Sequence, residues 1–383
     1  MKSGRKRPVF WVTGVAMACL LGVVSARQAG PEEAPPVSEN VFRDIQLLKG
    51  MPVDTFFDVM GMFASSMGDD CTYCHSADAV FRREAFGDPT PRIQRARQMI
   101  VMVRALNDTY FGGAPRVTCF TCHRGMYAPV DAPLLSLQYG VPEEEPNVRN
   151  FPPETGTAAD AILDKYLQAL GGTERLAQVS SVVASGTYAG FDTGMGEVPV
   201  EVVIRAPNQR SLTVHMFNGD SHRVFDGVNG WWAGPDSPVP IETLTSGNLD
   251  RYRLEALVAL PAGIKQAFSQ WTVGRTAIDD LEVMIVQGVN PDSGLLPVNL
   301  YFDVETGLLV RWVRWNGTPL GPVPTQVDYG DYRDVAGAGI KMPFTWTVSK
   351  TYMQHTVRLN DVQVNVPVEA ARFARPAPGT PRL

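Results

Sequence analysis

C-T-Y-C-H at residues 71–75 and C-F-T-C-H at residues 119–123 are the most informative stretches of this 383-residue chain. Each is a complete C-x-x-C-H motif, in which two thiols can form thioether bonds to the vinyl groups of one porphyrin. The histidine that follows directly can then ligate the iron of the same macrocycle. The sequence therefore predicts two covalently bound haem c groups. The predicted attachment residues are Cys71, Cys74, Cys119 and Cys122, and the predicted proximal iron ligands are His75 and His123.

Two other uses of paired cysteines fit this chain less well. An all-cysteine zinc site usually has its C-x-x-C pairs about 15–20 residues apart, whereas 44 residues separate Cys74 from Cys119. A redox-active dithiol is expected beside a strand of a βαβ unit, and neither pair follows a predicted strand. Neither alternative explains why a histidine follows both pairs.

Composition and charge narrow the class of protein further. Hydrophobic residues make up 44% of the chain, which is ordinary for a globular protein with a core. The formal net charge of −6 argues against nucleic-acid binding. Only Cys19 lies outside the two motifs, so we expect no disulfide framework.

The N-terminus has the features of an export signal. A basic segment at residues 2–7 precedes an apolar run at residues 9–24 and a small-residue cleavage site that ends at Ala26. We predict that residues 1–26 are a signal peptide or, if uncleaved, an N-terminal membrane anchor, although the run is short for a span. Either form places the rest of the chain in the periplasm. Export agrees with haem c attachment, which occurs outside the bacterial cytoplasm.

The composition changes along the chain and predicts several segments. Apolar residues recur at every second position in residues 198–204, 212–216 and 300–304, between turn residues, which is typical of antiparallel hairpins. The predicted segments are the signal peptide or anchor (1–26), a flexible leader (27–40), a dihaem cytochrome c domain (41–127), a Pro-rich linker (128–157), an antiparallel β domain (158–377) and a tail (378–383). The predicted fold class is α + β multidomain: a small all-α dihaem domain, then a curved antiparallel sheet with a helical insertion near residues 249–268.

A helix is predicted before each motif, and each could supply a second axial ligand. The first covers about residues 52–66 and stops at Gly68, a natural C-cap. One continuous face of it carries Phe56, Met60, Phe63 and Met67. Met67 is too close to Cys71 to fold back onto the haem. Methionine opposite histidine suits an electron carrier, but a methionine on an apolar helix face is more often part of the core.

The second helix is predicted to start with Thr90 as N-cap and Pro91 at the first helical position. Met99 and Met102 lie on a common face of it. From the residues alone, the choice between Met60 and Met62, and between Met99 and Met102, remains open.

Residues 40–126 resemble one half of the cytochrome c subunit of photosynthetic reaction centres. The stretches that carry this resemblance are residues 44–51, 71–75, 99–107 and 117–125. In that family, each haem unit is a helix with the methionine ligand, then a turn and a C-x-x-C-H motif. The resemblance implies Met60 and Met99 as the distal iron ligands. The chain departs from the family in having one such pair of units instead of two.

The resemblance also implies a function. The implied function is electron transfer in the periplasm. Such a carrier takes electrons from a redox protein donor and re-reduces a membrane-bound acceptor, such as a photosynthetic reaction centre. We expect no catalytic residue of the protein's own. Two alternatives remain open: a dihaem enzyme, such as a peroxidase with one open haem, and a lipid- or lipoprotein-binding module with an attached redox domain.

The predicted β domain is similar in strand pattern to the half-barrel of periplasmic lipoprotein carriers. The similarity rests on strand layout and on residues 300–303 and 306–309. It implies an apolar cleft that could hold lipid. Candidate lining residues are Trp231, Trp232, Trp312 and Trp315, with packing in the sheet core as the alternative. His215 and His355 are expected to face solvent from the outer side of their strands.

Overall fold

The computed structural model describes Met1 and residues 34–378, apart from residues 130, 134, 140–146, 236 and 238. Apart from Met1, the predicted signal peptide or anchor, with Cys19, lies outside the described residues, as do most of the leader and the tail. The chain from Pro35 onward forms one compact unit. No helix in the described part of the chain is long and apolar enough to cross a membrane.

The first part of this unit is helical, as predicted, and we call residues 38–127 the helical region. α2 spans Val53–Met67 and ends at Gly68, whose φ of 68° is the left-handed conformation of a C-cap glycine. α3 spans Pro91–Phe111, and its N-cap Thr90 accepts a hydrogen bond from the Ile93 N–H. The shorter helices of the region are α1 (Ser38–Val41), η1 (Cys71–Tyr73), η2 (Ala77–Val80), η3 (Arg83–Gly87) and α4 (Cys119–His123), and α5 (Leu135–Tyr139) follows the region in the sequence.

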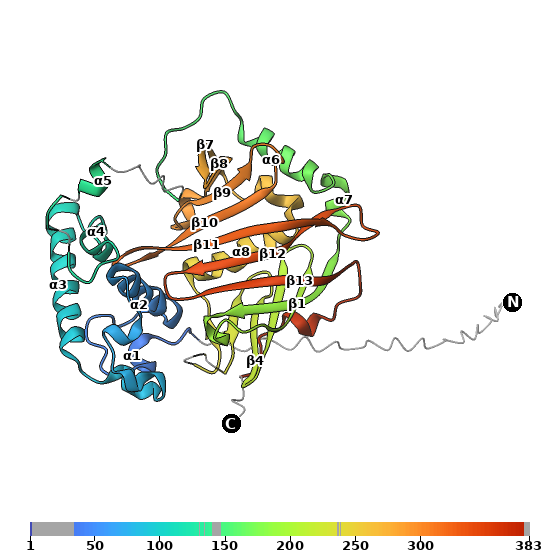
Figure 1. Ribbon diagram of the computed structural model, residues 1–383. Helices are drawn as coiled ribbons and strands as arrows, with labels where there is room; N and C mark the ends of the chain where they lie inside the picture. Colours follow the sequence, from blue (N-terminus) through green and yellow to red (C-terminus); the bar gives the residue numbers. More distant parts are fainter. Residues whose placement is uncertain are drawn as a thin grey trace. The chain divides into compact units, whose positions relative to one another are not determined.

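The second part, which we call the sheet region (residues 158–377), contains one antiparallel sheet of 13 strands (Figure 1). The strand order is β6-β5-β4-β3-β2-β1-β13-β12-β11-β10-β9-β8-β7, so every contact except β1–β13 joins strands that are consecutive in sequence. The strands are β1 (Ser181–Gly190), β2 (Val198–Arg205), β3 (Gln209–Met216), β4 (Gly219–Phe225), β5 (Gly230–Ala233), β6 (Glu242–Thr243), β7 (Gln270–Ile278), β8 (Leu281–Val289), β9 (Val298–Asp303), β10 (Leu309–Thr318), β11 (Gly321–Asp334), β12 (Lys341–Lys350) and β13 (Gln354–Val364).

Alternation along the strands gives the sheet an apolar inner face. Leu300, Phe302 and Trp312 belong to one large buried cluster on this face. The helices that complete the cluster are α6 (Ala159–Ala169), α7 (Thr173–Ala177) and α8 (Ser246–Ala259), with the 3-10 helix η5 (Pro261–Gln266). α8 and η5 are the predicted helical insertion. The predicted fold class, helices followed by a curved antiparallel sheet with a helical insertion, is confirmed.

The end of the predicted Pro-rich linker lies on the opposite face of the sheet. The Asn299 side-chain amide donates to the Val148 carbonyl at 2.9 Å. Phe151 packs in a second apolar cluster on this face, where Gly274 leaves room for its ring. From residue 147 onward the linker is therefore bound to the sheet.

Candidate functional site

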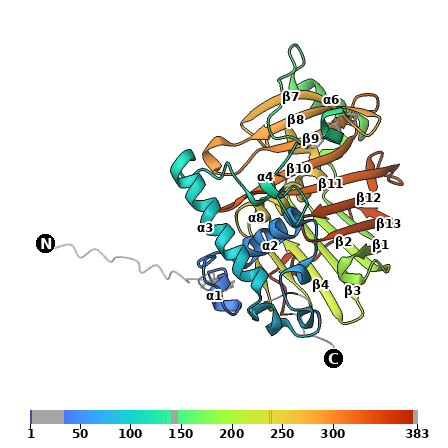
Figure 2. The ribbon, with the colours of Figure 1, turned by 60° about the vertical axis from the view of Figure 1, so that its left-hand side comes forward.

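Both C-x-x-C-H motifs lie against α2. This helix contacts η1, which begins at Cys71 of the first motif, and α4, which is the second motif. The Gly125 N–H, just after the second motif, donates to the Ser66 carbonyl at 3.0 Å. A Cβ on Gly68 would overlap the Gly125 carbonyl oxygen, so this position requires glycine for space as well as for its φ. Figure 2 shows α2 between α3 and the strands of the sheet.

The first motif is held by the start of α3. The Thr90 hydroxyl donates to the Cys74 carbonyl at 2.6 Å, and Arg92 donates to the Tyr73 carbonyl at 2.6 Å. The guanidinium of Arg92 also lies 4.1 Å from the centre of the Tyr73 ring. The N-cap that starts α3 is therefore the same residue that positions the first motif.

The imidazole of the first motif is oriented by the backbone. His75 Nδ1 lies 2.8 Å from the Phe86 carbonyl oxygen, which can only accept, so Nδ1 carries the proton. Burial lowers the pKa of His75, which favours the neutral ring. A neutral imidazole whose Nδ1–H is engaged in this way presents Nε2 as the free ligating nitrogen.

The second motif is held by the end of α3. The side chain of Asn107 donates to the Val117 carbonyl at 2.8 Å and accepts from the Val117 N–H at 2.9 Å. Thr118 and Thr121 then form a capping box at the start of α4. His123 Nδ1 lies 3.1 Å from the Met126 carbonyl oxygen, so this imidazole repeats the arrangement of the first. α3 therefore links the two motifs, one at each end.

α2 has two distinct faces. Asp58 and Met62 point to the sheet: Met62 is 5% exposed and packs in a small cluster with Leu320 and Val323 of the β10–β11 hairpin. The face predicted from the sequence lies on the other side. Its members are Phe56, Met60, Phe63 and Met67, of which Phe56 is buried and the others are half-buried. On α3, Met99 is half-buried and Met102 is 44% exposed.

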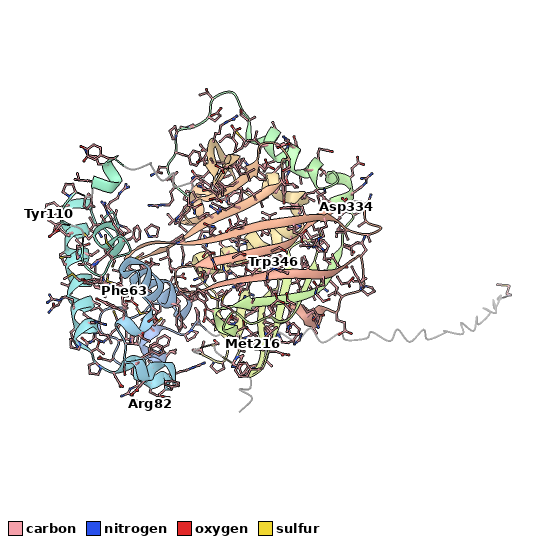
Figure 3. All side chains as sticks on the ribbon, in the orientation of Figure 1. Phe63, Arg82, Tyr110, Met216, Asp334 and Trp346 are labelled. Atoms are coloured by element: carbon pink, nitrogen blue, oxygen red, sulfur yellow. The ribbon has the colours of Figure 1, made fainter. Side chains whose placement is uncertain are left out.

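Large apolar side chains are exposed around the motifs. Tyr110, at 72% exposure, projects outward from α3 (Figure 3). The other exposed members of this set in the helical region are Phe81, Phe86, Val101, Met102, Phe111, Phe120, Met126 and Tyr127. Two apolar macrocycles would supply a covering surface for such a set. Together with two thiols and one oriented imidazole at each motif, these residues fit haem c.

A group of buried polar side chains fixes α2 to the sheet region. Asp54 accepts hydrogen bonds from the Thr245 backbone N–H (2.6 Å) and hydroxyl (2.9 Å). Asp58 Oδ2 accepts from the side-chain amides of Asn248 and Asn316, both at 2.7 Å. Burial raises the pKa of Asp54 to about 6. These carboxylates were not predicted as functional from the sequence, although two aspartates at i, i+4 in a largely apolar helix were a usable signal.

Two further ionisable groups complete this assembly. Lys350 Nζ lies 3.8 Å from Asp58 Oδ1, and burial lowers the pKa of this lysine. Glu242 is 5% exposed, and burial followed by repulsion from Asp54 raises its pKa well above the usual range. We call Asp54, Asp58, Glu242 and Lys350 the α2 charge cluster.

The prediction that His355 faces solvent is wrong. It alternates in phase with Val357 and Leu359, which point inward, and it is 4% exposed. Arg223 donates to its Nε2 at 3.1 Å, and its ring stacks on Tyr188 with 4.9 Å between the centroids. Burial and the neighbouring arginine lower the pKa of His355 well below its usual value. His215 is exposed, as expected, and lies 3.1 Å from Asp220.

The inner face of the sheet encloses a cavity of only about 50 Å³. Its lining includes the buried ion pair of Arg210 and Glu255. An apolar cavity of about 150 Å³ holds a single benzene molecule, and this one has about a third of that volume, which is too small for an acyl chain. The four candidate tryptophans do not line it. Trp231, Trp312 and Trp315 are buried in the protein, and Trp232 donates to the Ser221 hydroxyl.

Comparison with known proteins gives a match for the helical part of the chain. Residues 19–151 match the family model described as the photosynthetic reaction centre cytochrome C subunit. The photosynthetic reaction center cytochrome c subunit of Roseobacter denitrificans is 27% identical over an alignment of 103 residues. The alignment covers 23% of this chain and 27% of that protein. The chain thus spans about a quarter of this curated relative's length.

Two solved structures are similar to the sheet region at a low level. A LolA superfamily protein from Nitrosomonas europaea aligns with a TM-score of 0.38 and 12% identity, over 57% of this chain and 98% of that chain. A DUF1329 family protein from Desulfovibrio piger aligns with a TM-score of 0.37 and 9% identity, over 56% and 96%. The helical part of the chain is thus similar to reaction centre cytochrome c subunits.

Proposed function

We propose that this chain is an exported dihaem c-type cytochrome that transfers single electrons in the periplasm. Its donor would be a redox protein and its acceptor a membrane-bound partner, such as a photosynthetic reaction centre. The observation that carries the proposal is the repeated geometry of the motifs: in both, the histidine Nδ1 is held by a backbone carbonyl. The match of residues 19–151 to reaction centre cytochrome c subunits supports the same function.

The residues of this chain divide the work of holding the two haems. Bound haem supplies a one-electron couple between ferric and ferrous iron. Cys71 and Cys74 anchor one group, and Cys119 and Cys122 the other. His75 and His123 ligate through Nε2, because their Nδ1 atoms are engaged with carbonyl oxygens.

We assign the distal ligands to Met60 and Met99. Met62 is the less suitable choice because its thioether packs between α2 and the β10–β11 hairpin. Met60 lies on the opposite side of α2 from Asp58, where it is half-buried and packs against the outside of the same cluster. Met99 is likewise half-buried on α3, whereas Met102 is exposed.

The N-terminal sequence supports the proposed location. Its basic segment, apolar run and small-residue site are typical of export, and an uncleaved form would attach the protein to the membrane. The proposed reaction-centre partner rests on the family match alone. This chain spans about a quarter of the length of the curated relative.

Substituting one cysteine of each motif tests the proposal. We expect Cys71→Ala and Cys119→Ala each to reduce the covalent haem content from two to one, and to lower the amount of protein recovered. Thr72→Ser and Phe120→Tyr, at variable positions of the same motifs, are the matched controls and should keep both haems. A haem content of two after either cysteine substitution would overturn the assignment.

The spectrum of the oxidised holoprotein separates electron transfer from enzymatic turnover. We expect a low-spin spectrum with the methionine-to-iron charge-transfer band and no binding of carbon monoxide. A high-spin signal or a carbon monoxide complex would instead indicate a dihaem enzyme with one open iron.

A further inference from the structure

Glu242, on β6, is a buried carboxyl group next to the haem-bearing helix α2. It is 5% exposed, and its Oε2 accepts no hydrogen bond from any described residue. The charged and titratable groups that face it are Asp54 and Asp58 from α2, Arg251 from α8, Lys350 from β12 and Tyr352 from the turn after β12.

The two cations near Glu242 have other partners. Arg251 forms an ion pair with Glu255 at 2.9 Å. Lys350 lies 3.8 Å from Asp58 and donates to the Tyr352 hydroxyl at 2.9 Å. Burial and the carboxylate of Asp54 therefore favour the protonated form of Glu242, and its pKa lies well above that of an exposed glutamate. A group in this state ionises above neutral pH instead of below it.

α2 separates this carboxyl group from Met60. Asp54, which is hydrogen-bonded to Thr245 near β6, is six residues before Met60, or about 9 Å along the helix axis. The residues of α2 between Asp54 and Met60 include the buried Thr55, Phe56 and Val59, and charges interact more strongly in buried protein than they do in water. Any change of charge on the Met60 side of the helix therefore alters the proton affinity on the Glu242 side.

We propose that Glu242 is a redox-linked proton-binding site, which binds a proton when the haem held at α2 is reduced and releases it when that haem is oxidised. The inference rests on the proposed function, because it needs a haem beside α2. In the reduction step, one electron from the donor converts ferric to ferrous iron, and one proton from solvent converts the Glu242 carboxylate to the carboxylic acid. Oxidation reverses both.

The sign and size of the effect follow from electrostatics. Reduction removes one positive charge, so the proton affinity of Glu242 rises. The size depends on the distance between the two charges: at an effective dielectric constant of about 20, a unit charge about 12 Å away would change the proton affinity about tenfold. A tenfold change corresponds to about 59 mV for a one-electron couple. One midpoint potential should therefore fall by about this amount as the pH rises through the titration of Glu242.

Spectroelectrochemical titration of the holoprotein at a series of pH values from about 6 to about 10 tests the inference. In the wild type, we expect one midpoint potential to fall by about 59 mV between an acidic and an alkaline plateau. Glu242→Gln, which keeps the shape of the neutral side chain, should stay at the acidic plateau throughout. Glu197→Gln is the control, because Glu197 is exposed and paired with Arg358, and it should titrate like the wild type.

A second measurement needs no variant: proton uptake on chemical reduction, followed with an indicator dye in weakly buffered alkaline solution. Any of three results would overturn the inference. They are wild-type midpoint potentials that do not change with pH, no proton uptake on reduction, and a pH dependence of the potential in Glu242→Gln equal to that of the wild type. These results leave the proposed function in place, since they require a protein with haem. Absence of haem would overturn the proposed function, and this inference with it.

Discussion

The helical region and the sheet region differ in where their large apolar side chains lie. In the sheet region, one large cluster on the inner face includes Trp312, Leu300 and Phe302, all essentially inaccessible to solvent. In the helical region, the buried cluster is small and takes two of its members, Leu320 and Val323, from the sheet. Aromatic residues such as Phe81 and Tyr110 are exposed there. The sheet region has a core of its own, whereas the helical region takes part of its core from the sheet and leaves many large apolar side chains exposed.

The largest expected effect comes from withholding haem. Without the two groups, the helical region loses the apolar surface that would cover its exposed side chains, and it should not fold stably. We expect limited proteolysis of such apoprotein to cleave within residues 38–127 and to leave a resistant fragment that contains the sheet. Equal resistance of both regions would remove the distinction between them.

Creating a cavity in the sheet core should destabilise the sheet region and leave the haem content of the folded protein unchanged. Trp312→Ala removes a fully buried side chain and should lower the free energy of unfolding by about 3–5 kcal/mol. Chemical denaturation followed by far-ultraviolet circular dichroism measures this loss. The folded fraction should still carry two haems, and a variant that is stable but has lost a haem would contradict the comparison.

Removing the contact between the two regions should have an intermediate effect. Asp58→Ala leaves Asn248 and Asn316 without their shared acceptor in a buried site, which should cost about 3 kcal/mol in unfolding free energy. Asp58→Asn keeps one acceptor oxygen and should cost less. Denaturation followed by haem absorbance reports the helical region, and no change there would show that α2 is not held by the sheet.

Substitutions of Met60 and Met62 in α2 should separate iron ligation from core packing. Met62→Leu preserves volume in the α2–hairpin contact and should cost less than about 1.5 kcal/mol, with the haem spectrum unchanged. Met60→Leu should abolish the methionine-to-iron charge-transfer band of one haem and lower its potential. The reverse pattern in the visible spectrum would move the ligand to Met62.

The smallest expected effect is a pH dependence in the sheet region. Because the folded pKa of His355 lies below its ordinary value of 6.5, the unfolded chain binds a proton there first as the pH falls. Stability should therefore be full above about pH 6.5 and decrease below it, by up to about 1.4 kcal/mol per pH unit. In His355→Gln this part of the decrease should disappear from urea titrations at pH 5–7, and an unchanged slope would assign it to other groups.

Local features of this protein could be predicted from its sequence because they depend on neighbours along the chain. Gly68 ends α2 and Thr90 starts α3, as their capping preferences indicate. Strand alternation predicted the hairpins, as in residues 198–216 and 300–304. His355 was placed on the wrong face, because alternation shows which residues share a face and not whether a polar member of the set finds buried partners.

Contacts between distant segments were beyond this kind of prediction. Asp58 meets Asn316 across 258 positions of the chain, and Asp54 meets Thr245 across 191. Nothing local to α2 indicates that Asp58 is matched by side-chain amides on α8 and β10. The same holds for Glu242, whose neighbours come from three other elements.

The intact mass of the protein purified from its native compartment tests the central claim most directly. Two covalently attached haems should add the mass of two haem groups to the mature polypeptide, and fragments containing residues 71–75 and 119–123 should each carry one. A mass equal to that of the bare polypeptide, or a single added haem, would contradict the account.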